Sequence, residues 1–358
     1  MNVYSATLGK TERVIYKLRG LYEQYGYSQY KMSKFEEYDL YVRNKSFLQS
    51  ASIITFTDTD GKLMALKPDV TLSIIKNSKD TEGGVRKVYY NENVYRVPRG
   101  ELSYREIMQA GLECMGEIDA YSISEVLGLA AKSLSEISDE YVLDVSDLDI
   151  LSSLMDELGI KDGQRSELLC CIAEKNTSEI DKLCFMNSEA ANVIKALVSL
   201  KGGSDEMLEV LKGRACYDEA CEFARTLSML QTQFGARIRI DFSVIDDTSY
   251  YNGIVFKGFV RSIPTALLSG GRYDGLVKRM NKKGGALGFA VYLDKIDQLE
   301  CDTVEYDVDT FVQYSNGDSA DMVYSTVEAL TKKGERVLAG KRIPEKLKYR
   351  TLIKLGEE

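Results

Sequence analysis

A polar face within one predicted strand is the first feature of the sequence that could do chemistry. A strand sends successive side chains to opposite faces, so residues 107–114 would place Gln109, Gly111 and Glu113 on one face. The other face would carry apolar neighbours: Met108, Ala110, Leu112 and Cys114. Gly111 would leave room while Gln109 and Glu113 supply oxygen acceptors, which suits the floor of a pocket. An ordinary solvated face of a sheet fits the same pattern equally well.

Glycines gather in a second segment, residues 268–275 (LSGGRYDG), directly after a predicted strand. Paired glycines at the end of a strand let the backbone approach a ligand or another strand closely, although this signal alone is weak. The sequence contains neither the G-x-x-x-x-G-K-[ST] loop nor the G-x-G-x-x-G loop that holds phosphates in many nucleotide-binding proteins. We therefore expect no phosphate site of either common kind.

The chain has no histidine. This absence excludes a serine or cysteine nucleophile with a histidine base, and it excludes metal sites built on imidazole. The seven cysteines form no C-x-x-C pair and are odd in number, which argues against a disulfide framework or a zinc knuckle. We expect no metal and no cofactor.

The composition predicts a soluble chain with one large domain and smaller attachments. Of its 358 residues, 44% are hydrophobic, which is enough for a sizeable core. The formal net charge of −9 repels polyphosphate backbones, so we expect no nucleic-acid partner. No stretch matches a signal peptide or the ~20 apolar residues that cross a bilayer. We expect a cytoplasmic protein without a membrane partner.

The elements that would position the polar face follow from hydrophobic periodicity. Residues 11–25 place apolar side chains on one helical face, and residues 85–117 contain two strand-like runs around the loop 98–103. Helical periodicity dominates residues 121–234, and strand patterns then return in four runs: 236–244, 253–263, 265–269 and 286–293. This order predicts an α+β fold in which a helical insertion, about residues 121–234, separates two halves of an antiparallel sheet.

The tail has the pattern of a small additional unit. We predict a strand at 309–314, a helix at 319–333, a short strand at 336–339 and then a last helical stretch. The expected domains are residues 1–300 and a truncated α/β domain of residues 305–358. About 50 residues are marginal for independent folding, so this domain should dock on the main body.

Several short motifs together resemble histidyl-tRNA synthetase. They occur in the order and approximate spacing of that family, and the resemblance covers about residues 4–297. The motifs within it are LKPDVT at 66–71, VYR at 94–96, REIMQ at 105–109, YYNG at 250–253, GGRYDG at 270–275 and GFA at 288–290. The set is specific, although each member alone is not. The resemblance implies a class II aminoacyl-tRNA synthetase fold, with an antiparallel sheet flanked by helices, and a dimer formed through the N-terminal part.

The same resemblance implies a site for free histidine. Asp69 stands where the synthetases place an acidic residue against the α-amino group, and Tyr251 and Tyr273 match side chains near the imidazole. The full set of matching positions is Asp69, Thr71, Gln109, Glu113, Tyr251 and Tyr273. An ammonium that leaves water needs carboxylates and oxygen acceptors around it, so the set is chemically reasonable.

The positions that would contact ATP depart from the synthetase pattern. Residues 246–249 read DDTS where the synthetases carry a catalytic arginine, and Lys295, preceded by Asp294, stands where another arginine clamps the nucleotide. Arg96 is retained as a residual contact for phosphate or another anion. Removing one group that stabilises transition-state charge costs about 2.7 to 4 kcal/mol, so these losses argue against adenylation. We expect no catalytic residues.

A retained amino-acid pocket beside an altered nucleotide site resembles the family of ATP phosphoribosyltransferase regulatory subunits. That resemblance implies a non-catalytic subunit of histidine biosynthesis, with a homodimer core in a hetero-oligomer, that activates a short-form catalytic subunit and makes it sensitive to histidine. The absence of histidine from the chain would suit a protein needed when histidine is scarce, although compositional drift explains it equally well. The alternatives are an amino-acid-activating enzyme similar to histidyl-tRNA synthetase and a scaffold whose pocket is a relic.

Overall fold

The structure is a computed structural model that describes residues 8–44, 53–78, 84–97, 103–184, 187–245, 250–298 and 306–356. The chain forms two compact units, one of Thr11–Leu299 and one of Met1–Lys10 with Glu300–Glu358. The predicted boundary between the domains, at residues 300–305, lies outside the described residues. Among the described helices, none is long and apolar enough to cross a membrane.

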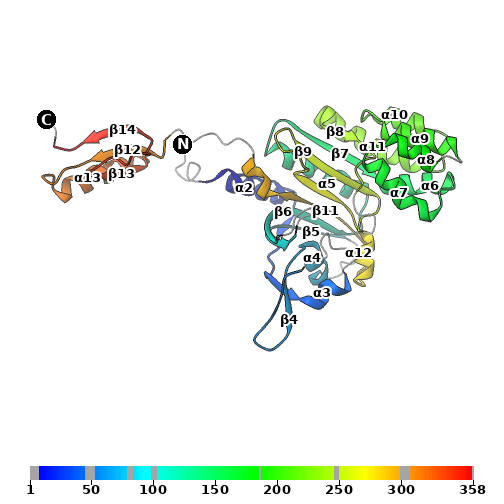
Figure 1. The fold of residues 1–358 in the computed structure, drawn as a ribbon, viewed down its shortest axis with the longest axis horizontal. Coiled ribbons are helices and arrows are strands. Elements are labelled where there is room, and N and C mark those ends of the chain that lie inside the picture. The colour runs from blue at the N-terminus through cyan, green and yellow to red at the C-terminus, as the bar shows by residue number, and fades with distance from the viewer. Residues whose placement is uncertain are drawn as a thin grey trace. The chain divides into compact units, whose positions relative to one another are not determined.

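An eight-stranded sheet forms the centre of the larger unit (Figure 1). Its order is β1-β5-β6-β11-β10-β9-β7-β8. The strands are β1 (Ser28–Gln29), β5 (Val85–Arg96), β6 (Arg105–Gly116), β7 (Tyr141–Asp147), β8 (Ile238–Ile240), β9 (Ile254–Val260), β10 (Leu268–Arg272) and β11 (Gly285–Tyr292). The interior pairs are antiparallel, as predicted, whereas each edge strand runs parallel to its neighbour, β1 to β5 and β8 to β7.

The two faces of this sheet carry separate apolar cores. One core takes up Ala110, Leu112 and Cys114 from β6 together with α2 (Lys10–Gln24) and α5 (Ala120–Ser135), and Met108 packs against it. The predicted apolar face of residues 107–114 is therefore confirmed. The other core lies under α4 (Thr71–Asn77) and α12 (Asp274–Arg279). Residues 109, 111 and 113 must face this second side because they alternate with the first set.

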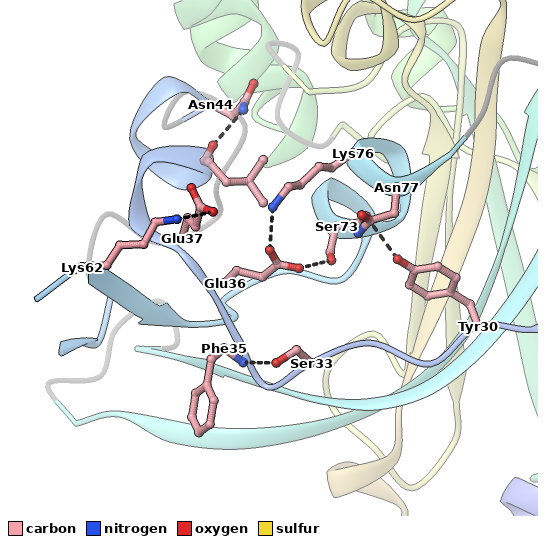
Figure 2. A network of polar contacts seen from close by, with 11 residues as sticks. Tyr30, Ser33, Phe35, Glu36, Glu37, Asn44, Lys62, Ser73, Lys76 and Asn77 are labelled. Carbon is pink, nitrogen blue, oxygen red and sulfur yellow. Dashed lines mark hydrogen bonds and ion pairs between the residues drawn. The ribbon is translucent and has the colours of Figure 1, made fainter. Parts of the chain in front are cut away.

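A three-stranded sheet supports the segment that leads into α4. Glu36 accepts hydrogen bonds from Ser73 Oγ at 2.6 Å and from Lys76 Nζ at 2.9 Å, and both donors lie on α4 (Figure 2). Because α4 begins at Thr71, these bonds hold in place the segment that carries Asp69 and Thr71. The elements of this region are β2 (Phe35–Glu37), α3 (Tyr38–Arg43), β3 (Thr55–Thr57) and β4 (Leu63–Leu66), with β4 in the middle.

The helical insertion contains a strand that the periodicity did not predict. Tyr141–Asp147, inside the predicted helical range 121–234, forms β7 and pairs with β9 and β8. The helices follow as a separate lobe (Figure 1): α6 (Leu148–Glu157), α7 (Asp162–Ala173), α8 (Thr177–Leu183), α9 (Ser188–Val198), α10 (Ser204–Leu211) and α11 (Tyr217–Phe234). Parallel strands need a long crossover, and this lobe supplies it between β7 and β8.

The smaller unit is a three-stranded parallel sheet of order β13-β12-β14 with one helix. Its elements are β12 (Val308–Gln313), α13 (Ala320–Lys332), β13 (Val337–Gly340) and β14 (Tyr349–Lys354). The prediction of a final helical stretch was wrong, because residues 349–354 pair with β12 as a strand. Short apolar runs do not distinguish a strand from a helix until the pairing strand is known.

Candidate functional site

A pocket in the larger unit lies against the central strands, on the face of the sheet that carries the second core. It contains all of the residues that the resemblance placed around histidine, and it also contains Arg96. The residues that line it are Asp69, Val70, Thr71, Tyr90, Arg96, Gln109, Glu113, Tyr250, Tyr251, Ser269, Tyr273, Gly288, Phe289, Ala290 and Tyr292. Segments far apart in the sequence therefore converge on one polar cavity.

Glu113 lies at the floor of the pocket and is 2% exposed. Thr71 Oγ1 donates to one carboxylate oxygen at 2.8 Å, and the Tyr273 hydroxyl donates to the other in a short hydrogen bond. Burial raises the pKa of Glu113 from 4.5 to about 8, although these two hydrogen bonds oppose the shift. A cation beside this carboxylate would favour its ionised form.

Asp69 stands in the short connection between β4 and α4. Its Oδ1 accepts a hydrogen bond from the Leu72 backbone N–H at 2.8 Å, which orients the carboxylate at the start of the helix. Burial raises the pKa of Asp69, while the Leu72 N–H and the charge of Arg96 lower it. One cavity thus holds two carboxylates, Asp69 and Glu113.

Two glycines make room for these side chains. Gly288 on β11 pairs with Glu113 on β6, and a Cβ at residue 288 would collide with the Glu113 carboxylate. A Cβ at Gly271 on β10 would lie 2.6 Å from Cδ1 of Tyr251. The glycines that the sequence marked in two separate motifs therefore leave the volume in which the acid and the aromatic ring sit.

Tyrosine rings form one wall of the pocket. The Tyr250 ring lies 4.6 Å from that of Tyr251 and 5.7 Å from that of Tyr273, measured between centroids. Sequence reasoning named Tyr251 and Tyr273 but missed other polar lining residues: Tyr90, Tyr250, Ser269 and Tyr292. Strand alternation could have found Tyr90, because it lies on the same face of its strand as Arg96.

Among the described residues that line the pocket, Arg96 is the one cationic side chain. Arg96 ends β5 and is 9% exposed. Lys295 does not line the pocket; its ammonium donates to the Ala266 carbonyl at 2.7 Å and lies 4.8 Å from the centroid of the Tyr292 ring. Burial lowers the pKa of Lys295. The altered segment 246–249 lies outside the described residues.

The arrangement suits a small molecule with separated charges. Asp69 and Glu113 would attract a cationic group, and Arg96 would attract an anionic one. Among the residues that the structure describes, no group of three or more Cys, Asp or Glu side chains could hold a metal ion. The two carboxylates and the guanidinium thus give the pocket groups of both charges that a small zwitterion could meet.

Comparisons with known proteins show what the chain is similar to. The family model described as histidyl-tRNA synthetase matches residues 2–296. The chain is 30% identical to an ATP phosphoribosyltransferase regulatory subunit from Caldanaerobacter subterraneus subsp. tengcongensis over 292 residues, which covers 78% of this chain and 76% of the relative.

Two solved structures share the fold. One is described as an ATP phosphoribosyltransferase regulatory subunit/histidyl-tRNA synthetase from Bacillus halodurans, with a TM-score of 0.75 and 21% identity over 96% of this chain and 93% of that chain. The other is from an ATP phosphoribosyl transferase complex of Thermotoga maritima, with a TM-score of 0.63 and 19% identity over 78% of this chain and 96% of that chain. The predicted class II synthetase-like fold is thereby confirmed.

Proposed function

The chain belongs to the family of histidyl-tRNA synthetases and ATP phosphoribosyltransferase regulatory subunits, and from this premise we propose that it binds histidine without activating it. In this role it would activate a short-form ATP phosphoribosyltransferase catalytic subunit and make that subunit sensitive to histidine. The observation that carries the proposal is the pocket itself, which holds Asp69, Thr71, Gln109, Glu113 and the paired tyrosines in one cavity.

The charges of the pocket suggest how histidine would lie in it. Its ammonium group would meet Asp69, and its carboxylate would meet Arg96. Its ring would lie near Glu113, between Tyr251 and Tyr273. Each charged end then exchanges water for an oppositely charged partner, which offsets the cost of removing the ligand from solvent.

The non-catalytic part of the proposal depends on the missing cations. Adenylation needs positive charge around the α-phosphate. Each group that stabilises the transition-state charge there lowers the activation free energy by about 2.7 to 4 kcal/mol. Lys295, which is not among the lining residues, is held by the Ala266 carbonyl and lies over the ring of Tyr292. Among the described lining residues Arg96 is the one cation. These features support binding without activation.

We propose a hetero-oligomer as the working form. The T. maritima neighbour was solved as an ATP phosphoribosyl transferase complex, which supports a catalytic subunit as the partner of this chain. A homodimer of the larger unit would form the core of the assembly. The proposed domains remain residues 1–300 and 305–358.

Reconstitution tests the function directly. The purified chain is mixed with a short-form catalytic subunit, and phosphoribosyl transfer is measured with and without histidine. We expect the chain to raise the activity and histidine to lower it. Asp69→Asn should keep the activation and weaken the inhibition, while Asp58→Asn, in an exposed turn that is absent from the pocket lining, should behave like the unmodified chain.

An ATP–pyrophosphate exchange assay separates the proposal from the amino-acid-activating alternative. The chain alone should give no histidine-dependent exchange, because the pocket offers one arginine to the phosphates. Robust exchange, or a histidyl-adenylate made by the chain unaided, would contradict the proposal. A relic pocket would instead give no histidine binding at all.

A further inference from the structure

The polar groups of the pocket divide into two sets. Glu113 is bonded to Thr71 and Tyr273, and the Ser269 hydroxyl lies 2.8 Å from that of Tyr292. A second set forms no hydrogen bond with any residue that the structure describes: the Tyr90 hydroxyl, the Gln109 carboxamide and the Arg96 guanidinium. All three residues line the cavity, so the second set is where a ligand would gain hydrogen bonds.

Tyr90 is fixed in place by the strand beside it. The residue lies on β5 opposite Gly111 on β6, and it is 2% exposed. A Cβ at residue 111 would lie 2.6 Å from the Tyr90 hydroxyl oxygen, so the ring extends across the glycine. This lack of a side chain at residue 111 is what lets the hydroxyl reach the cavity.

The surroundings keep the hydroxyl of Tyr90 protonated. Burial raises the pKa of Tyr90 well above its ordinary value, and the negative charges of Glu113 and Asp69 raise it further. A neutral phenol can donate one hydrogen bond. Near Glu113, the pocket thus offers a ligand a neutral donor beside a carboxyl group, which becomes an anionic acceptor when it loses its proton.

The position of Tyr90 along β5 indicates which end of the ligand it meets. Arg96 lies six residues further along the same strand, which corresponds to about 20 Å of backbone at roughly 3.3 Å per residue. Both side chains line the cavity. They therefore enter it from different ends, and if Arg96 takes the carboxylate, Tyr90 lies at the side-chain end.

We propose that Tyr90 is a ligand-binding residue that gives the pocket its specificity for a nitrogen heterocycle. A neutral imidazole has one N–H donor and one acceptor nitrogen. Glu113 would accept from the N–H, and the Tyr90 hydroxyl would donate to the other nitrogen. This inference rests on the proposed histidine site and assigns a residue to it that the family resemblance did not name.

Calorimetric titration with two probes tests the assignment. The probes are histidine and 3-(2-thienyl)alanine, which has a five-membered ring without nitrogen. Tyr90→Phe should weaken histidine binding roughly 10-fold, as expected for a lost buried hydrogen bond, and should leave thienylalanine binding unchanged. Tyr89→Phe is the matched control: this neighbour points to the opposite face, where its hydroxyl donates to Glu23 at 2.6 Å, so both affinities should stay unchanged.

The outcomes distinguish this inference from the function on which it rests. If the unmodified chain binds histidine and Tyr90→Phe binds it equally well, or loses both probes alike, the assignment of Tyr90 is wrong and the histidine site stands. If the unmodified chain does not bind histidine, the proposed site fails as well. Should Tyr90→Phe not fold, the ¹⁵N spectrum of labelled histidine on the unmodified chain decides, because a hydrogen-bonded acceptor nitrogen supports the assignment and a free one overturns it.

Discussion

Glu113→Gln is expected to weaken histidine binding by about 10- to 150-fold. The glutamine keeps the size of the side chain and can still pair with Thr71 and Tyr273, so the change removes mainly the negative charge. A hydrogen bond to a charged group contributes about 1.5 to 3 kcal/mol, which gives that range of dissociation constants. Isothermal titration at about pH 8 measures it directly, where the ligand-bound carboxylate is ionised.

The same substitution should remove a pH dependence of stability in the ligand-free chain. Burial raises the pKa of Glu113 from 4.5 to about 8, so between these values the folded chain binds more protons at this site than the unfolded chain does. Glu113 therefore lowers the free energy of unfolding as the pH rises through that window, by an amount on the order of 5 kcal/mol at about 1.4 kcal/mol per pKa unit. In Glu113→Gln this contribution is absent.

Chemical denaturation at about pH 5.5 and about pH 8.5 measures the effect. Relative to the unmodified chain, Glu113→Gln should gain stability at the higher pH, because the unmodified chain then holds a buried carboxylate. Glu106→Gln is the control, since Glu106 lies on the same strand in an exposed pair with Tyr95. If Glu113→Gln binds histidine like Glu106→Gln and shows the same stability difference between the two pH values, the carboxylate does not act as argued.

Further substitutions test the packing around the site. Gly288→Ala should abolish measurable histidine binding in titrations, because its Cβ would occupy the position of the Glu113 carboxylate. Lys67→Ala should lower the free energy of unfolding by about 3 to 5 kcal/mol in urea titrations, since it leaves the carboxylate of Glu92 without its buried partner at 2.5 Å. Lys62→Ala, which breaks an exposed pair, should cost less than about 1 kcal/mol in the same assay, and an equal loss in both variants would contradict the argument from burial.

The chain alone should also show a proton linkage on binding. At about pH 7, histidine should displace a proton from Glu113, because the imidazole N–H at Glu113 and the ammonium group beside Asp69 both favour the ionised carboxylate, whose pKa burial had raised to about 8. Calorimetry in two buffers of different ionisation enthalpy would detect the released proton. An identical binding enthalpy in both buffers would show that Glu113 keeps the same protonation state.

The amino-acid sequence determined the features that depend on local periodicity and on short motifs. Alternation in residues 107–114 placed Met108, Ala110, Leu112 and Cys114 on an apolar face, and the structure confirms it. The motifs identified the family and the polar residues that converge on the pocket. These features follow from the sequence because strand and helix periods are properties of neighbouring residues.

The tertiary structure decided whatever depends on partners far away in the chain. Tyr141–Asp147 became a strand because β9 and β8 pair with it, although helical patterns surround it. Residues 349–354 became a strand for the same reason, because they pair with the edge of β12.

The space available in the pocket also depends on distant pairing. Gly288 admits the carboxylate of Glu113 only because β11 pairs with β6, and Tyr90 reaches the cavity only because Gly111 lies opposite it. Residue type alone cannot show which side chain fills the space beside a glycine. The register between strands fixes it, and that register is set by the packing of the whole sheet.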